Sequence, residues 1–176
     1  MNIKGSTNIV GLIGHPVEHS FSPPMHNAAF NALNMDWAYV AFDVNPFNVK
    51  SAIEGAKSLN IKGFNVTIPH KRAIIPYLDH LSPEAQAVGA VNVIQITDNQ
   101  LIGHNTDIIG FHETLTPLLK PYHTHAVILG TGGASQAVQY VLHQLNIPFR
   151  LITHKELDAN TITQLAPIII NTTPLG

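Results

Sequence analysis

A short apolar run in the first half of the chain ends in residues that are able to do chemistry. Residues 61–66 predict a buried strand, and Pro69 ends it because proline donates no hydrogen bond to a sheet. The side chains gathered at this end are those of Asn65, Thr67, His70 and Lys71. Amide, hydroxyl and ammonium groups together suit a small polyhydroxylated anion, and open α/β sheets bind ligands at strand ends. The alternative interpretation is a surface turn with a solvated lysine.

Two serines follow an earlier apolar run, residues 8–14, which predicts the first strand. Ser22 is a suitable N-cap, with Pro23 at the first helical position. Capping explains Ser22 alone. We therefore expect the hydroxyl of Ser20 to stand in the loop, available to a ligand.

A glycine-rich turn occurs in the second half of the chain. Residues 125–129 predict a buried strand that runs into Gly130-Thr131-Gly132-Gly133-Ala134-Ser135, followed by a helix over 136–145 and a strand over 149–153. Glycines allow the backbone to turn tightly and to approach a pyrophosphate, which then lies at the helix N-terminus. The strand before and the helix after this turn favour a dinucleotide-binding site.

The residues after that second strand should select the dinucleotide, because an acidic side chain there binds a ribose 2′-hydroxyl and a basic one binds a 2′-phosphate. The chain offers Thr153-His154-Lys155-Glu156. His154 and Lys155 favour NADP, whereas Glu156 leaves NAD open. A solvated loop is the third interpretation.

The elements that must position these residues alternate between strand and helix. Residues 37–43 predict a second strand, and Asn45-Pro46 predicts the start of a helix. That helix would bury one face, made by Val49, Ile53, Ala56 and Leu59. The order β-α-β-α-β implies a parallel sheet with right-handed crossovers.

The middle of the chain predicts a short helix, a hairpin and a longer helix. Ser82-Pro83-Glu84 should open the short helix, and residues 89–96 should form a strand that returns through 98–100 into 101–103. The hairpin leads to His104-Asn105-Thr106-Asp107, after which the helical spacing of 108–119 suggests a bridge between two domains. A last strand is expected over 168–170, where its apolar edge would lack a neighbour.

Composition excludes several classes of protein. Of the 176 residues, 11% are charged and 45% are apolar, which indicates a globular chain and not a disordered one. A net charge of −2 without a basic run argues against nucleic acid as a partner. The sequence contains no cysteine, signal peptide or membrane-spanning run, so we expect a cytoplasmic protein without a membrane partner. Among eleven histidines, His15, His19 and His26 match no zinc spacing, so no metal is expected.

Six motifs in the same order make the chain resemble the shikimate dehydrogenase family over almost its whole length. They are Gly14-x-Pro16-x-x-His19-Ser20-x-Ser22-Pro23-x-x-His26-Asn27, Asn65-Val66-Thr67-x-Pro69-x-Lys71, Gly89-Ala90-Val91-Asn92, Asn105-Thr106-Asp107, Gly130-x-Gly132-Gly133-Ala134 and Asn171-x-Thr173-Pro174-x-Gly176. The resemblance implies an α/β fold, with a mostly parallel substrate domain (1–106) followed by an abbreviated Rossmann-like NADP-binding domain (107–176) that begins with a bridging helix (107–120). The chain would act as a monomer or homodimer.

The resemblance also implies roles for individual residues. Ser20 and Ser22 would bind the carboxylate of shikimate, while Thr67, Asn92 and Asp107 would bind its ring hydroxyls. Lys71 and Asp107 would form the catalytic pair, in which the ammonium delivers a proton to the developing alkoxide and the carboxylate holds it. The cofactor would contact Gly130, Thr131, Gly132, Gly133, Ala134, His154, Lys155 and Thr172.

The chain departs from the family pattern in two places. Family members usually have Asn-Arg-Thr where this chain has Thr153-His154-Lys155, so a bidentate phosphate clamp is missing. They also continue well past Gly176. Besides the NADPH-dependent reduction of 3-dehydroshikimate, two alternatives therefore stay open: a quinate/shikimate dehydrogenase that uses NAD, and a substrate-binding remnant without turnover.

Overall fold

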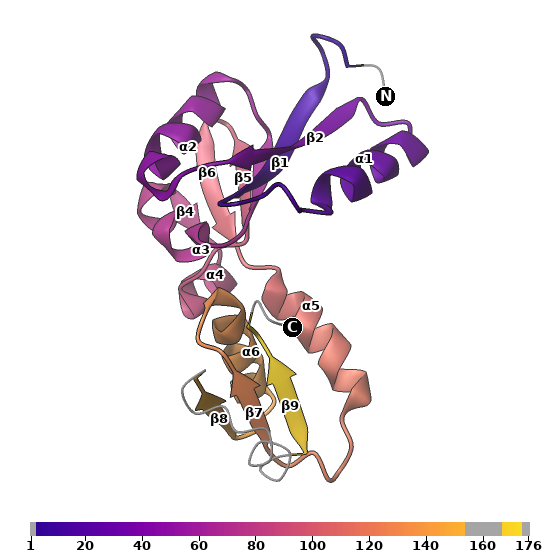
Figure 1. Cartoon of the computed structure of the whole chain (residues 1–176), viewed down its shortest axis with the longest axis vertical. Helices are drawn as coiled ribbons and strands as arrows, with labels where there is room; N and C mark the ends of the chain where they lie inside the picture. The colour runs from indigo at the N-terminus through magenta and orange to yellow at the C-terminus, as the bar shows by residue number, and fades with distance from the viewer. Residues whose placement is uncertain (1–2, 154–166, 174–176) are drawn as a thin grey trace. The chain divides into compact units, whose positions relative to one another are not determined.

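The computed structural model describes residues 3–153 and 167–173. The chain divides into two compact units, unit 1 (1–104) and unit 2 (105–176). The elements of each unit can be followed by their labels and colours in Figure 1. The division falls beside the predicted one between 106 and 107. In the described ranges, no helix is both long and apolar enough to cross a membrane.

Unit 1 is built on a six-stranded sheet with the order β2-β1-β3-β5-β6-β4. Its strands are β1 (Asn8–Gly14), β2 (Trp37–Asp43), β3 (Gly63–Val66), β4 (His80–Leu81), β5 (Val93–Thr97) and β6 (Gln100–His104). The first three strands pair in parallel, as predicted, and β5 runs antiparallel to both of its neighbours. Because two reversals restore the direction, β6 runs parallel to β3.

Helices lie on both faces of this sheet. They are α1 (Ser22–Ala32), η1 (Pro46–Asn48), α2 (Val49–Ser58), α3 (His70–Ala73), η2 (Ile75–Tyr77) and α4 (Pro83–Val88). Ile13 of β1 packs in the cluster that contains α2 residues, and its neighbour Leu12 packs in the cluster that contains Phe30 of α1. Successive strand residues face opposite sides of a sheet, so α1 and α2 cover opposite faces (Figure 1).

Several local predictions for unit 1 are confirmed. Ser82 caps α4, since its Oγ accepts the N–H of Ala85 at 3.2 Å. Asp98 and Asn99 both have positive φ, 48° and 60°, which is the backbone of a tight hairpin turn between β5 and β6. Val49, Ile53 and Ala56 of α2 are buried as expected.

Two predictions for unit 1 are wrong in detail. Leu59 is 74% exposed, because α2 has ended at Ser58 and Leu59 is its C-cap. The strand expected from residue 89 begins only at Val93, because Gly89 has a φ of +64° and terminates α4.

Unit 2 contains a three-stranded parallel sheet with the order β8-β7-β9. In the described residues its elements are α5 (Asp107–Leu115), η3 (Thr116–Leu118), β7 (Ala126–Leu129), α6 (Gly133–Gln144), β8 (Phe149–Ile152) and β9 (Ile168–Asn171). The helix expected from 136 starts three residues earlier, since Gly132 is its extended N-cap. Phe111 and Leu115 of α5 pack into the core of this unit, so the helix expected to be a bridge belongs to unit 2. At the outer strand, Ile169 is 44% exposed, in line with the predicted apolar edge.

Candidate active site

The carboxyl ends of β3 and β6 lie at the same edge of the sheet in unit 1. The register places Asn65 opposite Val93, and Val93 opposite His104. The edge therefore collects the turn that follows β3, the residues that precede β5 and the last residue of β6. Polar residues predicted from two separate motifs, Thr67 and Lys71 from one and Asn92 from the other, follow strand ends at this edge.

The turn after β3 is held by backbone hydrogen bonds on both sides. The N–H of Thr67 donates to the carbonyl of Ile13 at 2.9 Å, and the carbonyl of Lys71 accepts the N–H of Val91 at 2.7 Å. A side chain at Gly14 would collide with the methyl group of Thr67, so glycine allows the two turns to approach. Thr67 and Lys71 are thus fixed at their backbones.

Asn92 stands between the ends of two strands. Its N–H donates to the carbonyl of His104 at 3.0 Å, and its carbonyl accepts the N–H of Val66 at 2.8 Å. The residue is 8% exposed. The structure therefore brings the backbone of Asn92 next to the turn that carries Thr67, and the resemblance implies that both residues bind ring hydroxyls.

A cavity of about 300 Å³ joins the serine loop to the same turn. Its lining residues are Leu12, Pro16, Val17, Glu18, His19, Ser20, Ser22 and Thr67. Three residues that carry hydroxyl groups, from two motifs, thus line one hollow of unit 1. Hydroxyl groups are suitable donors for a small carboxylate.

At the start of α1, Ser20 takes the role that was predicted for Ser22. Ser22 is the first residue of α1 and makes no capping bond with its side chain; instead its N–H donates to Oγ of Ser20 at 3.2 Å. The Ser20 hydroxyl thus accepts one hydrogen bond within the loop, and its availability to a ligand stays a prediction. A hydroxyl that accepts one bond still has its own hydrogen to donate.

Two members of the predicted cluster face inward. His70 is 0% exposed, and its Nε2 lies 2.7 Å from the carbonyl oxygen of Val44. Oδ1 of Asn65 accepts the hydroxyl of Tyr39 at 2.7 Å. The expectation of one four-residue cluster at this turn is wrong for these two side chains, because partners on β2 and just after it take them up.

Tyr39 is a supporting residue that the sequence did not reveal. It is 5% exposed, its ring stacks on His26, and Asn27 binds its backbone through two hydrogen bonds of 2.9 Å. Burial raises the pKa of Tyr39 to about 12, and its hydrogen bond with Ser22 acts in the opposite direction. The sequence signal that pointed to Tyr39 was indirect. It was the pair His26-Asn27 in the serine motif, which lies about one helical turn after Ser22 in α1 and whose side chains contact Tyr39.

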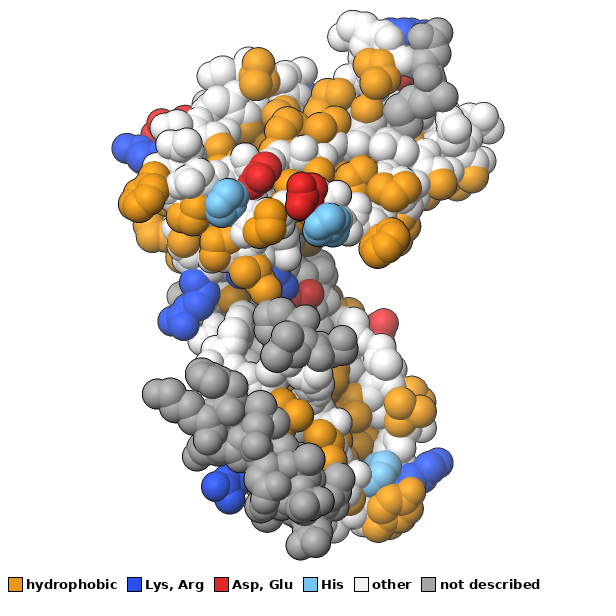
Figure 2. All heavy atoms as spheres, viewed as in Figure 1, with side chains coloured by type: hydrophobic (Ala, Val, Ile, Leu, Met, Phe, Trp, Pro, Cys, Tyr) orange, Lys and Arg blue, Asp and Glu red, His pale blue; other side chains and the backbone are white. Residues whose placement is uncertain are grey.

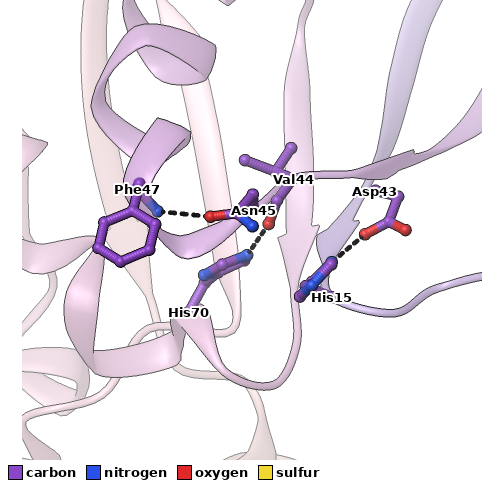
Figure 3. Close-up of polar contacts among 6 residues, drawn as sticks. All are labelled: His15, Asp43, Val44, Asn45, Phe47 and His70. Carbon is purple, nitrogen blue, oxygen red and sulfur yellow. Dashed lines mark hydrogen bonds and ion pairs between the residues drawn. The ribbon is translucent and has the colours of Figure 1, made fainter.

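Two histidine–carboxylate pairs lie on the surface of unit 1. Nδ1 of His15 contacts Oδ1 of Asp43, and Nε2 of His19 lies 3.1 Å from Oε1 of Glu18. Figure 2 shows histidine and acidic side chains gathered on one face of this unit, and Figure 3 shows His15 and Asp43 directed at one another. Within the described part of the chain, no three histidine, cysteine or acidic side chains gather as a metal site.

The other predicted catalytic residue, Asp107, lies in unit 2 at the first position of α5. Its N–H donates to Oδ1 of Asn105 at 3.1 Å, and Asn105 is 2% exposed. A buried amide thus orients the start of this helix. Lys71 belongs to unit 1.

The glycine turn of unit 2 has the backbone that an anionic group requires. Gly130 has a φ of +106°, which favours glycine, and its N–H donates to the carbonyl of Ile152 at 3.0 Å. A Cβ added at Gly132 would meet no atom of the described residues within 4 Å, so these residues leave the space above it open. The twelve-residue helix α6 begins directly after Gly132, and the first N–H groups of a helix are not used within it. The turn therefore fits a pyrophosphate.

Thr172 supports the glycine turn from the neighbouring strand. Its Oγ1 donates to the carbonyl of Leu129 at 2.6 Å, and its N–H donates to the same oxygen at 2.9 Å. The predicted cofactor contacts His154 and Lys155 lie outside the described residues, as do Glu156 and Gly176.

Comparisons with known proteins agree on one family. The family described as shikimate dehydrogenase substrate binding domain matches residues 12–94. A shikimate dehydrogenase (NADP(+)) of Methanobrevibacter smithii is 57% identical over 82% of this chain and 50% of its own length, and one of Methanosphaera stadtmanae is 43% identical over 99% and 70%. A crystal structure of shikimate dehydrogenase in complex with NADP+ is 41% identical with a TM-score of 0.80, covering 99% of this chain and 69% of its own. The chain thus spans between half and 70% of the length of these relatives.

Proposed function

The chain belongs to the shikimate dehydrogenase family, and we propose that it interconverts 3-dehydroshikimate and shikimate with NADP as the cofactor. The observation that carries the proposal is the edge of unit 1, where backbone hydrogen bonds to neighbouring residues hold Thr67, Asn92 and Lys71. Thr67 also lines a cavity together with Ser20 and Ser22. The relatives that match this chain bear the name shikimate dehydrogenase (NADP(+)).

Each polar group at this edge suits one part of a small hydroxylated acid. The hydroxyls of Ser20 and Ser22 would donate to the carboxylate, since both residues line the 300 Å³ cavity. Thr67 lines the same cavity and would bind a ring hydroxyl. Asn92 and Asp107 would bind the other ring hydroxyls, so that the ring is oriented by several bonds at once.

Lys71 and Asp107 would perform the proton transfer. When bound, NADPH supplies a hydride to the carbonyl carbon of the substrate. The ammonium of Lys71 donates a proton to the carbonyl oxygen as negative charge develops there. The carboxylate of Asp107 would hold that ammonium in place. In the reverse direction the neutral amine of Lys71 accepts the hydroxyl proton.

Unit 2 would bind the cofactor through residues 130–134. The open space above Gly132 and the N–H groups of α6 suit the pyrophosphate, and Thr131 stands exposed in the same turn. His154 and Lys155 would bind the 2′-phosphate, and Thr172 would be a further contact of the cofactor. Glu156 keeps NAD as the alternative dinucleotide.

Separate titrations of shikimate and NADP+ against this chain, followed by an assay of shikimate-dependent NADP+ reduction, test the proposal. Binding of both ligands with reduction is the expected result. Because the chain spans only part of its relatives, a substrate-binding remnant is the second candidate, and binding of shikimate without reduction would support it.

Two further measurements separate the remaining alternatives. Turnover of quinate with NAD at a rate equal to that of shikimate with NADP would favour a quinate/shikimate dehydrogenase, because quinate has an additional hydroxyl that a fitted pocket resists. A crystal structure with shikimate bound that leaves the Lys71 amine and the Asp107 carboxylate far apart would contradict the proposed catalytic pair.

A further inference from the structure

His70 directly precedes Lys71 in the chain, and its side chain is buried. It connects the turn that carries Lys71 to Val44, which lies 26 positions earlier in the sequence. Figure 3 shows the imidazole of His70 directed at the carbonyl of Val44, just beyond β2. We propose that His70 is a positioning residue for Lys71, acting through this hydrogen bond. The inference rests on the proposed function only where it assigns proton transfer to Lys71.

The bond fixes the turn to a rigid point. A carbonyl oxygen only accepts hydrogen bonds, so Nε2 of His70 carries the hydrogen and donates to Val44 at 2.7 Å. Val44 is itself held, because its N–H donates to the carbonyl of Gly14 at 2.9 Å. The imidazole therefore joins the turn after β3 to the ends of β1 and β2.

The helix that carries Lys71 needs such an anchor. α3 covers only His70–Ala73, about one turn, and a helix of this length has almost no stability of its own. Its first residue is bound at three points: the N–H of His70 donates to Thr67 at 2.8 Å, its carbonyl accepts the N–H of Ile74 at 3.0 Å, and its ring donates to Val44. With the carbonyl of Lys71 also bound, the backbone of this residue is held from both directions.

The environment of Nδ1, the second ring nitrogen of His70, indicates that the hydrogen bond from Nε2 is the reason for a histidine here. Nδ1 of His70 is buried and has no hydrogen-bond partner among the residues that the structure describes. A buried polar atom without a partner is destabilising, and an apolar ring of similar size would fill this space without that penalty. Packing alone would favour phenylalanine. What histidine adds is the single bond from Nε2 to Val44.

The same exit from β2 binds a second histidine at the surface. Asp43, the last residue of β2, contacts His15 of the loop that leads to the serines. The segment 43–44 therefore holds the two loops that follow β1 and β3, one at the solvent and one in the core. The buried contact is the one that touches the lysine turn.

Four variants separate positioning from general stability. His70→Phe keeps the ring but removes the donor, whereas His70→Gln places an amide N–H near the position of Nε2. His70→Asn is polar but too short to reach Val44, so it replaces His70→Phe if the latter does not fold. Ile53→Ala is the matched control, because Ile53 is a 1% exposed core residue of α2 outside the site.

The first measurement is the rate at which an acylating reagent modifies Lys71 relative to the exposed Lys120, read by peptide mass spectrometry. It needs no enzyme activity. Loss of the anchor should release the turn, so His70→Phe and His70→Asn should raise the Lys71 rate at least about threefold, with His70→Gln and Ile53→Ala within about twofold of wild type. Equal ratios in all variants would overturn the proposal.

The second measurement is the split between kcat and KM with shikimate. A displaced general acid should lower kcat by about tenfold in His70→Phe, change KM much less, and recover in His70→Gln. A kcat loss of the same size in Ile53→Ala, at equal thermal stability, would overturn the proposal. A wild-type chain that binds shikimate without any reduction would instead refute the proposed function, and the Lys71 labelling rates would still decide the role of His70.

Discussion

The turn after β3 in unit 1 and the turn after β7 in unit 2 both connect a buried strand to the helix that follows it. The first is built from side chains: His70 enters the core, Thr67 lines a cavity, and Lys71 follows. The second turn depends on glycines, which have no side chain. Gly130 has a φ of +106°, and no described atom lies within 4 Å of a Cβ placed on Gly132.

The two turns differ because they would offer different groups to a ligand. To place the ammonium of a lysine, a turn must fix the backbone position from which this long side chain extends. Hydrogen bonds to Ile13, Val44 and Val91 fix the first turn. A turn that presents backbone N–H groups must keep a ligand's approach open, and it is held from beneath by Thr172. The comparison predicts that side-chain substitutions impair the first turn and that added methyl groups impair the second.

The largest effect is expected for Lys71→Ala. Without a proton donor, turnover should fall by roughly a hundredfold or more, while shikimate affinity changes much less. Steady-state kinetics and a shikimate titration measure the two quantities. Lys50→Ala, which removes an exposed lysine paired with Glu54, is the control. Unchanged turnover in Lys71→Ala would exclude Lys71 from the mechanism.

The side-chain network beneath the first turn should also respond to alkali through Tyr39. Burial raises the pKa of Tyr39 from its ordinary value of 10.0 to about 12, so the unfolded chain loses this proton first. The contribution of Tyr39 is therefore complete below about pH 10 and is lost as pH rises towards 12, amounting to about 2–3 kcal/mol of unfolding free energy.

Urea unfolding between pH 9 and pH 12 measures this loss. Tyr39→Phe should reduce the alkaline decline in unfolding free energy by about 2–3 kcal/mol, and Tyr122→Phe, at a 68% exposed position, should leave the decline as it is. The same decline in Tyr39→Phe and wild type would mean that Tyr39 does not hold its proton more tightly in the folded state.

Two glycine variants sharpen the comparison for the second turn. A methyl group at Gly130 would lie 2.7 Å from Oγ1 of Thr172 in a backbone conformation that strains other residues, so Gly130→Ala should cost roughly 1–2 kcal/mol of stability. Gly132→Ala should leave the melting temperature unchanged, because no atom of the described residues lies within 4 Å of its Cβ. NADP+ affinity should nevertheless fall by about tenfold in Gly132→Ala, since the methyl occupies the ligand's space. Undiminished affinity in that variant would place the pyrophosphate elsewhere.

The smallest effect is expected at Thr172. Thr172→Val keeps the shape but removes the donor to Leu129, which should cost about 1 kcal/mol of unfolding free energy. Thr172→Ser retains the hydroxyl and should unfold close to wild type, as measured by thermal denaturation. If the two variants unfold alike, the hydroxyl does not support the glycine turn.

Local signals in the sequence predicted the parts of the fold that depend on neighbouring residues. The apolar runs gave β1, β2 and the strand before the glycine turn, and Ser82 caps α4 as its position before Pro83 indicated. The motifs that share the edge of unit 1 were also visible, because each follows or precedes a strand. These features need no knowledge of how strands pair.

The contacts that brace the site could not be predicted, because they join residues far apart in the chain. Tyr39 meets Asn65 and Val44 meets His70 across 26 positions each, and His15 meets Asp43 across 28. Each pair depends on the register between β1, β2 and β3, which a single sequence leaves open. The same uncertainty explains why Asn65 and His70 were expected to face a ligand.

β5 runs antiparallel to β3 and β6, so the turn of the β5–β6 hairpin lies at the opposite end of the sheet from the candidate site. Asn92 enters at the start of this strand, so the connection through Asp98 and Asn99 emerges at the opposite end of the sheet. That tip is a suitable place to insert an affinity peptide or a fluorophore, or to tether the protein to a sensor chip. Additions there would lengthen a loop without shifting the register that Val93 shares with Asn65 and His104.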